Sequence, residues 1–275
     1  VHHGGSLWRN RDGERLYNWN HQQGDFTTIV ASDFSPDGQW AITSDPHTLV
    51  LWKLEDGSAF RFWTAPGEVL STALSENGNF ALLGLADNTA VVFDIKRGGI
   101  KRTFSHQNRV RSVDLSDDGR FAITGSEDYT AALWDMGSSQ KILDMPHDDD
   151  VQLVAISPDG SLALSAAKYD SAKVWNTKTK QLIGTVPLAA EKLRRGLRFT
   201  AAKFSADNQY LLTGLPDQRV QLWSAKQLKL LKTWTLPKRD AWKPTSAATV
   251  AVGFGAGENQ YIAVASNGFI HRLKR

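Results

Sequence analysis

Residues 106–135 read HQNRVRSVDLSDDGRFAITGSEDYTAALWD. Segments 111–115, 121–125 and 131–135 are apolar or alternate between apolar and polar residues, as β-strands do. The residues between them, 117–119 and 127–128, are of types that favour tight turns. The stretch therefore predicts three short strands joined by two hairpins. Such a unit cannot bury its apolar surface alone and needs neighbours of its own type.

The same unit recurs along the whole chain. Turns like Ser116-Asp117-Asp118-Gly119 begin at Ser35, Ser75, Ser157, Ser205 and, in a degraded form, Gly255, which makes six copies. An aromatic residue ends the third segment at spacings of 41, 41, 41 and 48 residues, at Trp52, Phe93, Trp134, Trp175 and Trp223. In the sixth copy we expect His271 at this position. A period near 41 is typical of a β-propeller blade.

Residues 106–135 resemble a WD40 repeat through His106, the turn 116–119, Asp128 and the closing Leu133-Trp134-Asp135. The resemblance implies an all-β fold: a WD40-type β-propeller with four-stranded blades around a central channel, which usually serves as an interaction scaffold. Fold alone does not establish function.

The resemblance also implies a structural role for His106, Asp128 and Trp134. Together with Thr124 or Ser126 they match a hydrogen-bond network that ties a blade together. His147 and Trp175 repeat the 28-residue spacing of His106 and Trp134. Duplication suits architecture better than a single catalytic triad. Other copies keep only an Asp or have it one residue out of register, and we expect packing alone to hold them: Asp45, Asp87, Asp170 and Asp217.

Outer strands and ring closure follow from the segments between copies. Residues 60–63, 100–104, 141–145, 181–186 and 229–234 each predict the outer strand of the preceding blade, and the sixth copy lacks one. We expect residues 15–19 to supply it, giving six blades closed by an N-terminal strand, because closure covers an exposed sheet edge. The prediction is one propeller domain over 1–275. Residues 1–14 are an N-terminal extension or, since 6–9 look like the end of a repeat, the remnant of a seventh blade.

Composition limits the classes of function. The chain has 275 residues, 32 Lys and Arg against 29 Asp and Glu, and no cysteine. The small net charge disfavours nucleic acid as a partner, and the lack of cysteine excludes disulfides and thiolate metal sites. The sequence contains no run of about 18 apolar residues, so it predicts no transmembrane segment. The missing cysteine and the start at Val1 favour an exported, periplasmic protein, lipid-anchored through a removed N-terminal piece, with a cytoplasmic protein as the alternative.

Catalytic and metal-binding motifs are missing. The sequence has no phosphate-binding glycine loop, no G-x-S-x-G and no H-E-x-x-H. The run Asp148-Asp149-Asp150 lacks the spacing of a calcium loop. We expect no enzyme, no cofactor and no metal. The sequence sets no oligomeric state.

Two inter-blade connections, 187–199 and 235–246, are longer than the others, net positive and partly aromatic, with Phe199 among their apolar residues. Long loops on a rigid scaffold often carry function, and Arg with aromatic residues is typical of interfaces. We expect this face to bind a protein or peptide, acidic in character, through Arg109, Arg111, Arg194, Arg195, Arg198, Lys238, Arg239 and Trp242.

The channel mouth offers an alternative site. The resemblance assigns to it mostly charged or polar residues: Glu68, Arg109, Arg111, Glu127, Asp150, Gln152 and Thr200. An enzyme or small-ligand binder would use the mouth near Arg109, Arg111 and Asp150. A deep pocket with converging polar groups there would favour that alternative over the interaction scaffold.

Overall fold

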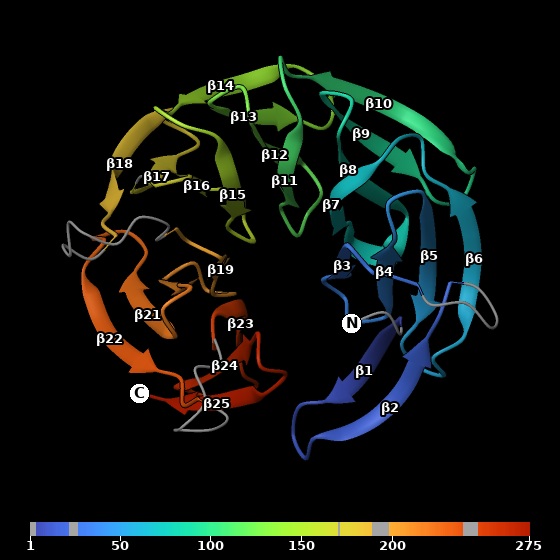
Figure 1. The fold of residues 1–275 in the computed structure, drawn as a ribbon. Coiled ribbons are helices and arrows are strands. Elements are labelled where there is room, and N and C mark those ends of the chain that lie inside the picture. Colours follow the sequence, from blue (N-terminus) through green and yellow to red (C-terminus); the bar gives the residue numbers. More distant parts are fainter. Residues whose placement is uncertain (1–3, 22–26, 170, 189–197, 239–246) are drawn as a thin grey trace.

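The computed structural model describes residues 4–21, 27–169, 171–188, 198–238 and 247–275. The fold is an all-β propeller with six blades, preceded by an N-terminal hairpin (Figure 1). The described residues contain one short 3-10 turn, Glu76–Gly78, and no helix in them is long and apolar enough to cross a membrane.

The hairpin consists of β1 (Gly5–Arg9) and β2 (Glu14–Trp19). Blades 1 to 3 are β3 (Ala31–Phe34), β4 (Trp40–Ser44), β5 (Thr48–Lys53), β6 (Ala59–Thr64); β7 (Val69–Leu74), β8 (Phe80–Leu85), β9 (Thr89–Asp94), β10 (Gly99–Ser105); and β11 (Val110–Leu115), β12 (Phe121–Ser126), β13 (Thr130–Asp135), β14 (Lys141–Pro146). Blades 4 to 6 are β15 (Val151–Ile156), β16 (Leu162–Ala167), β17 (Ala172–Asn176), β18 (Gln181–Val186); β19 (Ala201–Phe204), β20 (Tyr210–Gly214), β21 (Arg219–Ser224), β22 (Leu230–Thr235); and β23 (Thr249–Phe254), β24 (Gln260–Ala265), β25 (Ile270–Lys274).

Local turn chemistry explains the strands. In blade 3, Ser116 Oγ donates to Asp118 Oδ1 at 2.7 Å and accepts from the Phe121 amide at 3.0 Å. Gly119 has φ +66°, which suits glycine. The turn after Ser157 in blade 4 repeats this pattern. These contacts reverse the chain after the first strand of the blade, so strand two pairs antiparallel with strand one.

The core lies between blades rather than within one blade. One cluster joins Leu82 and Phe104 of blade 2 to Val113 and Trp134 of blade 3, all less than a tenth exposed. Similar clusters join each later blade to the next. The first strands of the blades face the centre of the ring, and the fourth strands form its perimeter (Figure 1). The predicted outer strands of the first five blades are confirmed, and in the described part of the chain the last blade has three strands.

The predicted closure of the ring is not what the structure shows. Residues 15–19 lie in β2, which pairs with β1 and not with β25. The reason is local: β1 and β2 are joined by a four-residue turn with Gly13 at φ +78°, so they pair without crossing the ring. Between this hairpin and blade 6, the Arg272 guanidinium donates to the Asn10 carbonyl.

The hairpin has the geometry of the outer half of a blade. Its pairing shifts register between Leu7 and Trp8, the same place relative to the tryptophan as the shift between Leu133 and Trp134 in blade 3. Trp19 of β2 stacks on Trp52 of blade 1 at 5.0 Å, as outer-strand residue Phe104 stacks on Trp134 at 4.6 Å. The hairpin therefore packs on blade 1 as a preceding blade would. This agrees with the alternative reading of residues 6–9 as the end of a repeat.

The strand register also corrects the sixth copy. Leu273 pairs with Tyr261 as Trp223 pairs with Leu211, so Leu273, and not His271, occupies the tryptophan position of blade 6. The longer connection before blade 6 places its turn 50 residues after the turn of blade 5, whereas the expectation assumed 48.

Close packing between blades leaves no room for a side chain at Gly125 of β12. A Cβ atom there would lie 2.8 Å from methyl carbons of Val151 and Val154 in blade 4. We expect Gly125→Ala to lower the free energy of unfolding by about 1–3 kcal/mol, because overpacking forces the blades apart. Gly253→Ala in β23 is the control, since a Cβ there meets nothing within 4 Å. Urea titrations would measure both, and equal stabilities would contradict this packing.

Candidate functional site

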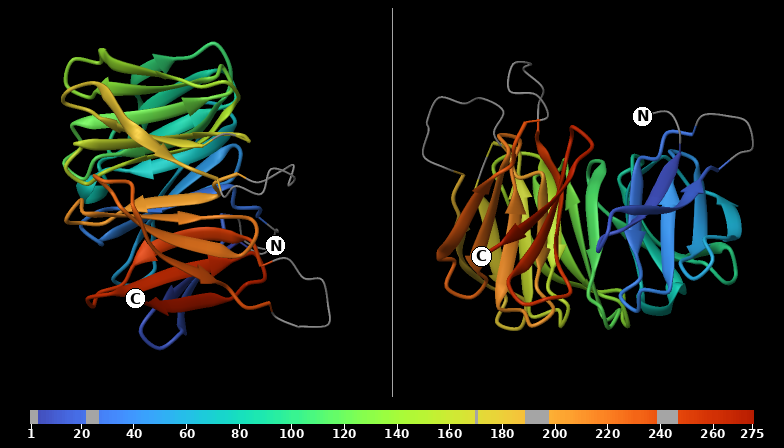
Figure 2. Two further views of the ribbon diagram at one scale, coloured as in Figure 1. Left: turned by 90° about the vertical axis from the view of Figure 1, so that its left-hand side faces the viewer. Right: turned by 90° about the horizontal axis from the view of Figure 1, so that it is seen from below.

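One end of the ring carries the turns between second and third strands and all connections between blades. This follows from the strand order, since each blade runs antiparallel from its innermost to its outermost strand. We call this end the loop face. It includes the turns 45–48, 86–89 and 127–130 and the connections 65–68, 106–109 and 147–150. The turns between third and fourth strands lie at the opposite end, as the edge-on views of Figure 2 allow the reader to follow.

In blade 3, a hydrogen-bond network lies under the loop face. His106 Nδ1 lies 2.9 Å from Asp128 Oδ2, and its Nε2 lies 2.8 Å from Thr124 Oγ1. Trp134 Nε1 donates to the same hydroxyl at 2.8 Å. Burial raises the pKa of Asp128, but hydrogen bonds from Thr130, Gln107 and His106 outweigh it, so the pKa lies below its ordinary value. The network joins the connection before β11, the turn after β12, and strands β12 and β13.

Blade 1 contains the same network, which the sequence analysis missed. His21 Nε2 lies 2.8 Å from Thr43 Oγ1, to which Trp52 Nε1 donates at 2.7 Å. His21 Nδ1 lies 3.2 Å from Asp45, which also accepts from the Thr48 amide. The expectation that packing alone holds this blade is wrong. His21 lies 31 residues before Trp52, whereas His106 lies 28 residues before Trp134. Pro46 adds a residue between Asp45 and Thr48. A search with the spacing of blade 3 therefore finds neither His21 nor Asp45.

The other blades keep parts of the network. In blade 4, His147 Nε2 lies 2.7 Å from Ser165 Oγ, to which Trp175 Nε1 donates at 3.1 Å; Asp170 lies outside the described residues. In blade 5, Trp223 donates to Thr213 at 3.0 Å, so the expectation that packing alone holds this blade is also wrong. Asp217 instead pairs with Arg219. In blade 2, the bonds of Asp87 to other described residues stay within its turn and go to the Thr89 amide and hydroxyl.

Around the channel mouth, the structure brings some predicted residues together and separates others. Arg111 and Glu127 form an ion pair whose side chains are 34% and 17% exposed. Arg109 is exposed, and its carbonyl accepts from the Glu127 amide at 2.9 Å. Asp150 belongs to the next connection, and its carbonyl accepts from the Lys168 amide. At the mouth, Arg111 is thus already paired with a carboxylate, that of Glu127.

The two long connections are described only at their ends. Arg198 and Lys238 are exposed, Arg198 just before the first strand of blade 5 and Lys238 just after its fourth strand. Arg194, Arg195, Arg239 and Trp242 lie outside the described residues. Phe199 was expected to add aromatic area to the surface, but it is 3% exposed and packs in the core between blades 4 and 5. An apolar residue next to a first strand is drawn into that core.

Inside the channel, three charged residues occupy the same repeat position, two residues before the turn serine: Asp33, Asp114 and Lys203 of blades 1, 3 and 5. Asp33 Oδ2 accepts from the Leu74 amide at 2.8 Å and Asp114 Oδ2 from the Ile156 amide at 2.9 Å, so each carboxylate ties its blade to the next. Burial raises the pKa of Asp33 to about 6. The pKa of Lys203 is also raised, mainly by the nearby carboxylate of Asp114 and to a smaller extent by that of Asp33. The cluster was not predicted from the sequence, although the shared repeat position was a signal for it.

A cavity of about 550 Å³ opens between the inner strands. Its walls include Asp33, Ser71, Thr200 and Val252, and Arg109, Arg111 and Asp150 are not among its lining residues. In the described part of the chain, no three His, Asp or Glu side chains are grouped closely enough to hold a metal ion. The polar groups proposed for small-ligand chemistry therefore do not converge on this cavity.

The family model for the WD domain, G-beta repeat, matches residues 13–53, 98–135 and 138–176. The first segment spans β2 to β5, the second β10 to β13 and the third β14 to β17, so the second and third segments each cover the outer strand of one blade and the first three strands of the next. No curated protein matches the chain.

The blade 1 network predicts unequal roles for two turn aspartates. Asp45→Ala removes a carboxylate that bonds His21, Thr48 and the His47 amide. We expect it to lower the free energy of unfolding by about 1–3 kcal/mol, because buried polar groups lose their partner. Asp87→Ala is the matched control and should cost about 0.5–1 kcal/mol, since Asp87 is exposed and bonds only Thr89. Denaturant titration that ranks the two variants in the opposite order would contradict the network.

The channel cluster predicts a pH dependence. The pKa of Asp33 is about 6 in the folded protein against an ordinary 3.8. Between about pH 4 and about pH 7 the unfolded chain therefore loses this proton first, and stability from this group falls as pH rises. Asp33→Asn removes the effect. We expect the free energy of unfolding of the wild type, minus that of Asp33→Asn, to decrease across this window and to stay level above it. A constant difference in urea titrations would contradict the raised pKa.

Proposed function

The chain belongs to the WD40-repeat family of β-propellers, and on that basis we propose that it is a non-catalytic platform that binds a protein or peptide on its loop face. WD40 propellers are typically interaction platforms. Because fold does not establish function, the proposal depends on the residues of this face. The observation that carries it is the pair of basic connections on blades 5 and 6, whose described ends expose Arg198 and Lys238.

The buried networks support a structural use of the residues that resemble a catalytic triad. Thr124 is 0% exposed, and its hydroxyl contacts both His106 and Trp134. A nucleophile must reach its substrate, and this hydroxyl does not reach the surface. The same arrangement around Thr43 in blade 1 would make a second triad of the same kind, which suits a repeated brace better than one active site.

We propose an acidic segment as the bound partner. Residues 187–199 carry Lys192, Arg194, Arg195 and Arg198 against Glu191, and residues 235–246 carry Lys238, Arg239 and Lys243 against Asp240. Excess positive charge on adjoining blades raises the association rate with an acidic partner and disfavours a basic one. Trp242 is the proposed anchor, because aromatic residues dominate binding energy at many interfaces.

The enzyme or small-ligand alternative at the channel mouth has less support. It needs Arg111 to meet a substrate, and Arg111 is engaged by Glu127. A substrate would first have to displace that carboxylate. Arg109 and Asp150 stand on different connections, and the channel cavity is lined by other residues.

The test is affinity capture from the native source, followed by identification of what co-purifies and by titration of the recovered partner. The variant Arg194→Glu/Arg195→Glu/Arg198→Glu should weaken binding about tenfold or more, because three favourable charge contacts become repulsive. Its melting temperature should stay near that of the wild type, since exposed substitutions rarely change stability.

The matched control reverses three charges on the opposite end of the ring. Arg97, Lys178 and Lys226 are exposed in turns between third and fourth strands. Arg97→Glu/Lys178→Glu/Lys226→Glu changes the net charge equally and should keep the wild-type affinity. Equal weakening by both variants would mean that only total charge matters, and an unaffected loop-face variant would reject the site.

A further inference from the structure

A cavity of about 510 Å³ opens between blades 2 and 3. Its lining residues belong to strands β8, β9 and β10 of blade 2 and to two turns of blade 3, one before β12 and one after β13. Both turns lie at the end of the ring opposite the loop face, which the edge-on views of Figure 2 help to locate. The volume is in the range of ligand-binding pockets. We call it the inter-blade cavity.

The cavity exists because one turn glycine stands away from the preceding blade. Between blades 3 and 4, the turn glycine Gly160 packs on the ring of Phe121, so that a Cβ atom there would lie 2.5 Å from the ring. Gly119 and Phe80 occupy the corresponding positions between blades 2 and 3. A Cβ atom on Gly119 would meet nothing within 4 Å. The space over Phe80 is therefore open to a ligand.

A cation replaces an apolar residue beside this space. In each four-stranded blade, the outer strand has one extra residue where its pairing with the third strand shifts. In blade 2 this residue is Lys101, and in the other four blades it is apolar: Phe60, Ile142, Ile183 and Leu231. A residue that breaks a repeated pattern is expected where a protein has a functional site.

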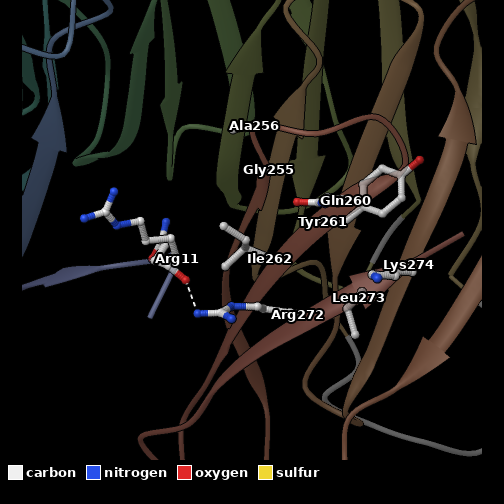
Figure 3. A pocket seen from close by; sticks show the side chains of 10 residues that line it. Arg11, Gly255, Ala256, Gln260, Tyr261, Ile262, Arg272, Leu273 and Lys274 are labelled. Carbon is white, nitrogen blue, oxygen red and sulfur yellow. Dashed lines mark hydrogen bonds between the residues drawn. The ribbon is translucent and has the colours of Figure 1, made fainter. Parts of the chain in front are cut away.

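The Lys101 ammonium is available to a ligand. It lies 4.0 Å from the centre of the Phe80 ring, and it forms no ion pair or hydrogen bond with another described residue. A cation–π contact at an exposed site is weak, so a carboxylate can displace it. By contrast, in the cavity between the hairpin and blade 6, the Arg272 guanidinium already donates to the Asn10 carbonyl (Figure 3).

Two arginines complete the basic wall. Arg102 donates to the carbonyls of Met136 and Gly137, the latter at 3.0 Å, which fixes its guanidinium beside the cavity. Arg120 Nε donates to Asp118 at 2.6 Å. Because a guanidinium has five N–H donors, both arginines keep donors for a bound anion.

The lining favours a ligand that is both acidic and aromatic. Lys101, Arg102 and Arg120 stand against a single lining carboxylate, that of Asp135, which already accepts from the Ser138 amide and hydroxyl. The apolar part of the lining includes Phe80 and the buried residues Val92 and Met136. Aromatic rings pack well on other rings and on methionine sulfur.

We propose that the inter-blade cavity binds a segment of a partner protein in which a carboxylate side chain is next to an aromatic one. The carboxylate pairs with Lys101 and Arg120, and the aromatic ring lies over Phe80 in place of the lysine ammonium. The site lies at the opposite end of the ring from the loop face and does not depend on the proposed function.

A designed peptide tests the proposal. The peptide GSEFSG, acetylated and amidated so that its Glu is the only carboxylate, is titrated into the isotope-labelled full chain and followed by NMR. We expect saturable binding below about 1 mM, with the largest shifts at the amides of Gly119 and Gly137. The peptides GSQFSG and GSEASG should each bind at least about fivefold more weakly, because one lacks the charge and the other the ring.

Variants of Lys101 separate the charge from the shape of the cavity. Lys101→Leu introduces the residue type that blade 5 has at this position, so the chain should fold as before, and binding of GSEFSG should weaken at least about fivefold. Lys101→Arg keeps the charge and should keep the binding. Lys232→Leu is the matched control, since Lys232 is exposed on the outer strand of blade 5 and its loss changes the net charge equally.

A further control excludes the loop face as the place where an acidic peptide binds. The variant Arg194→Glu/Arg195→Glu/Arg198→Glu should bind GSEFSG as the wild type does. Loss of binding in this variant, wild-type binding by Lys101→Leu, or equal binding of GSEFSG and GSQFSG would overturn the proposal. Absence of saturable shifts at the inter-blade cavity would overturn it as well.

Discussion

The structure depends on burying both faces of every sheet. A blade is apolar on each side, and the core clusters contain residues of two adjacent blades, such as Phe104 with Trp134 and Leu164 with Phe204. Each blade therefore needs a neighbour before and after it, and a curved row of twisted sheets satisfies this by turning into a ring. Glycines such as Gly125, where the next blade approaches too closely for a side chain, show how tight this contact is.

Buried hydroxyl groups hold the strands and the connection of a blade together through hydrogen bonds. Thr43, Thr124, Ser165 and Thr213 each accept a hydrogen bond from a strand tryptophan, and histidines bond three of these hydroxyls from the connection that enters the blade. Since an unpartnered polar group in a core is costly, these bonds fix the connection relative to the strands. The loop face is consequently a rigid support on which variable connections can differ without disturbing the blades.

In the described ring, the sheet faces between blade 6 and blade 1 are buried less completely than those between the other blades. There the hairpin β1–β2 packs on blade 1 through Trp19 and Trp52, while Trp8 is 46% exposed although tryptophans at the same register position in four blades are less than a tenth exposed. In the described part of the chain β1 and β2 form a two-stranded sheet, which covers Trp8 less than a four-stranded blade covers its tryptophan.

The sequence allowed the strands, the blade period and the outer strands of the first five blades to be predicted, because alternation and turn residues act within a few neighbouring positions. It also pointed to His106, Asp128 and Trp134 through their spacing. Tertiary structure decided the rest: the partner of β2, the role of His21, the place of Leu273, the burial of Phe199, and the meeting of Asp33, Asp114 and Lys203 in the channel. These depend on which strands face each other across loops of variable length and across the ring, and residues so far apart in the chain are brought together only by the packing of whole blades.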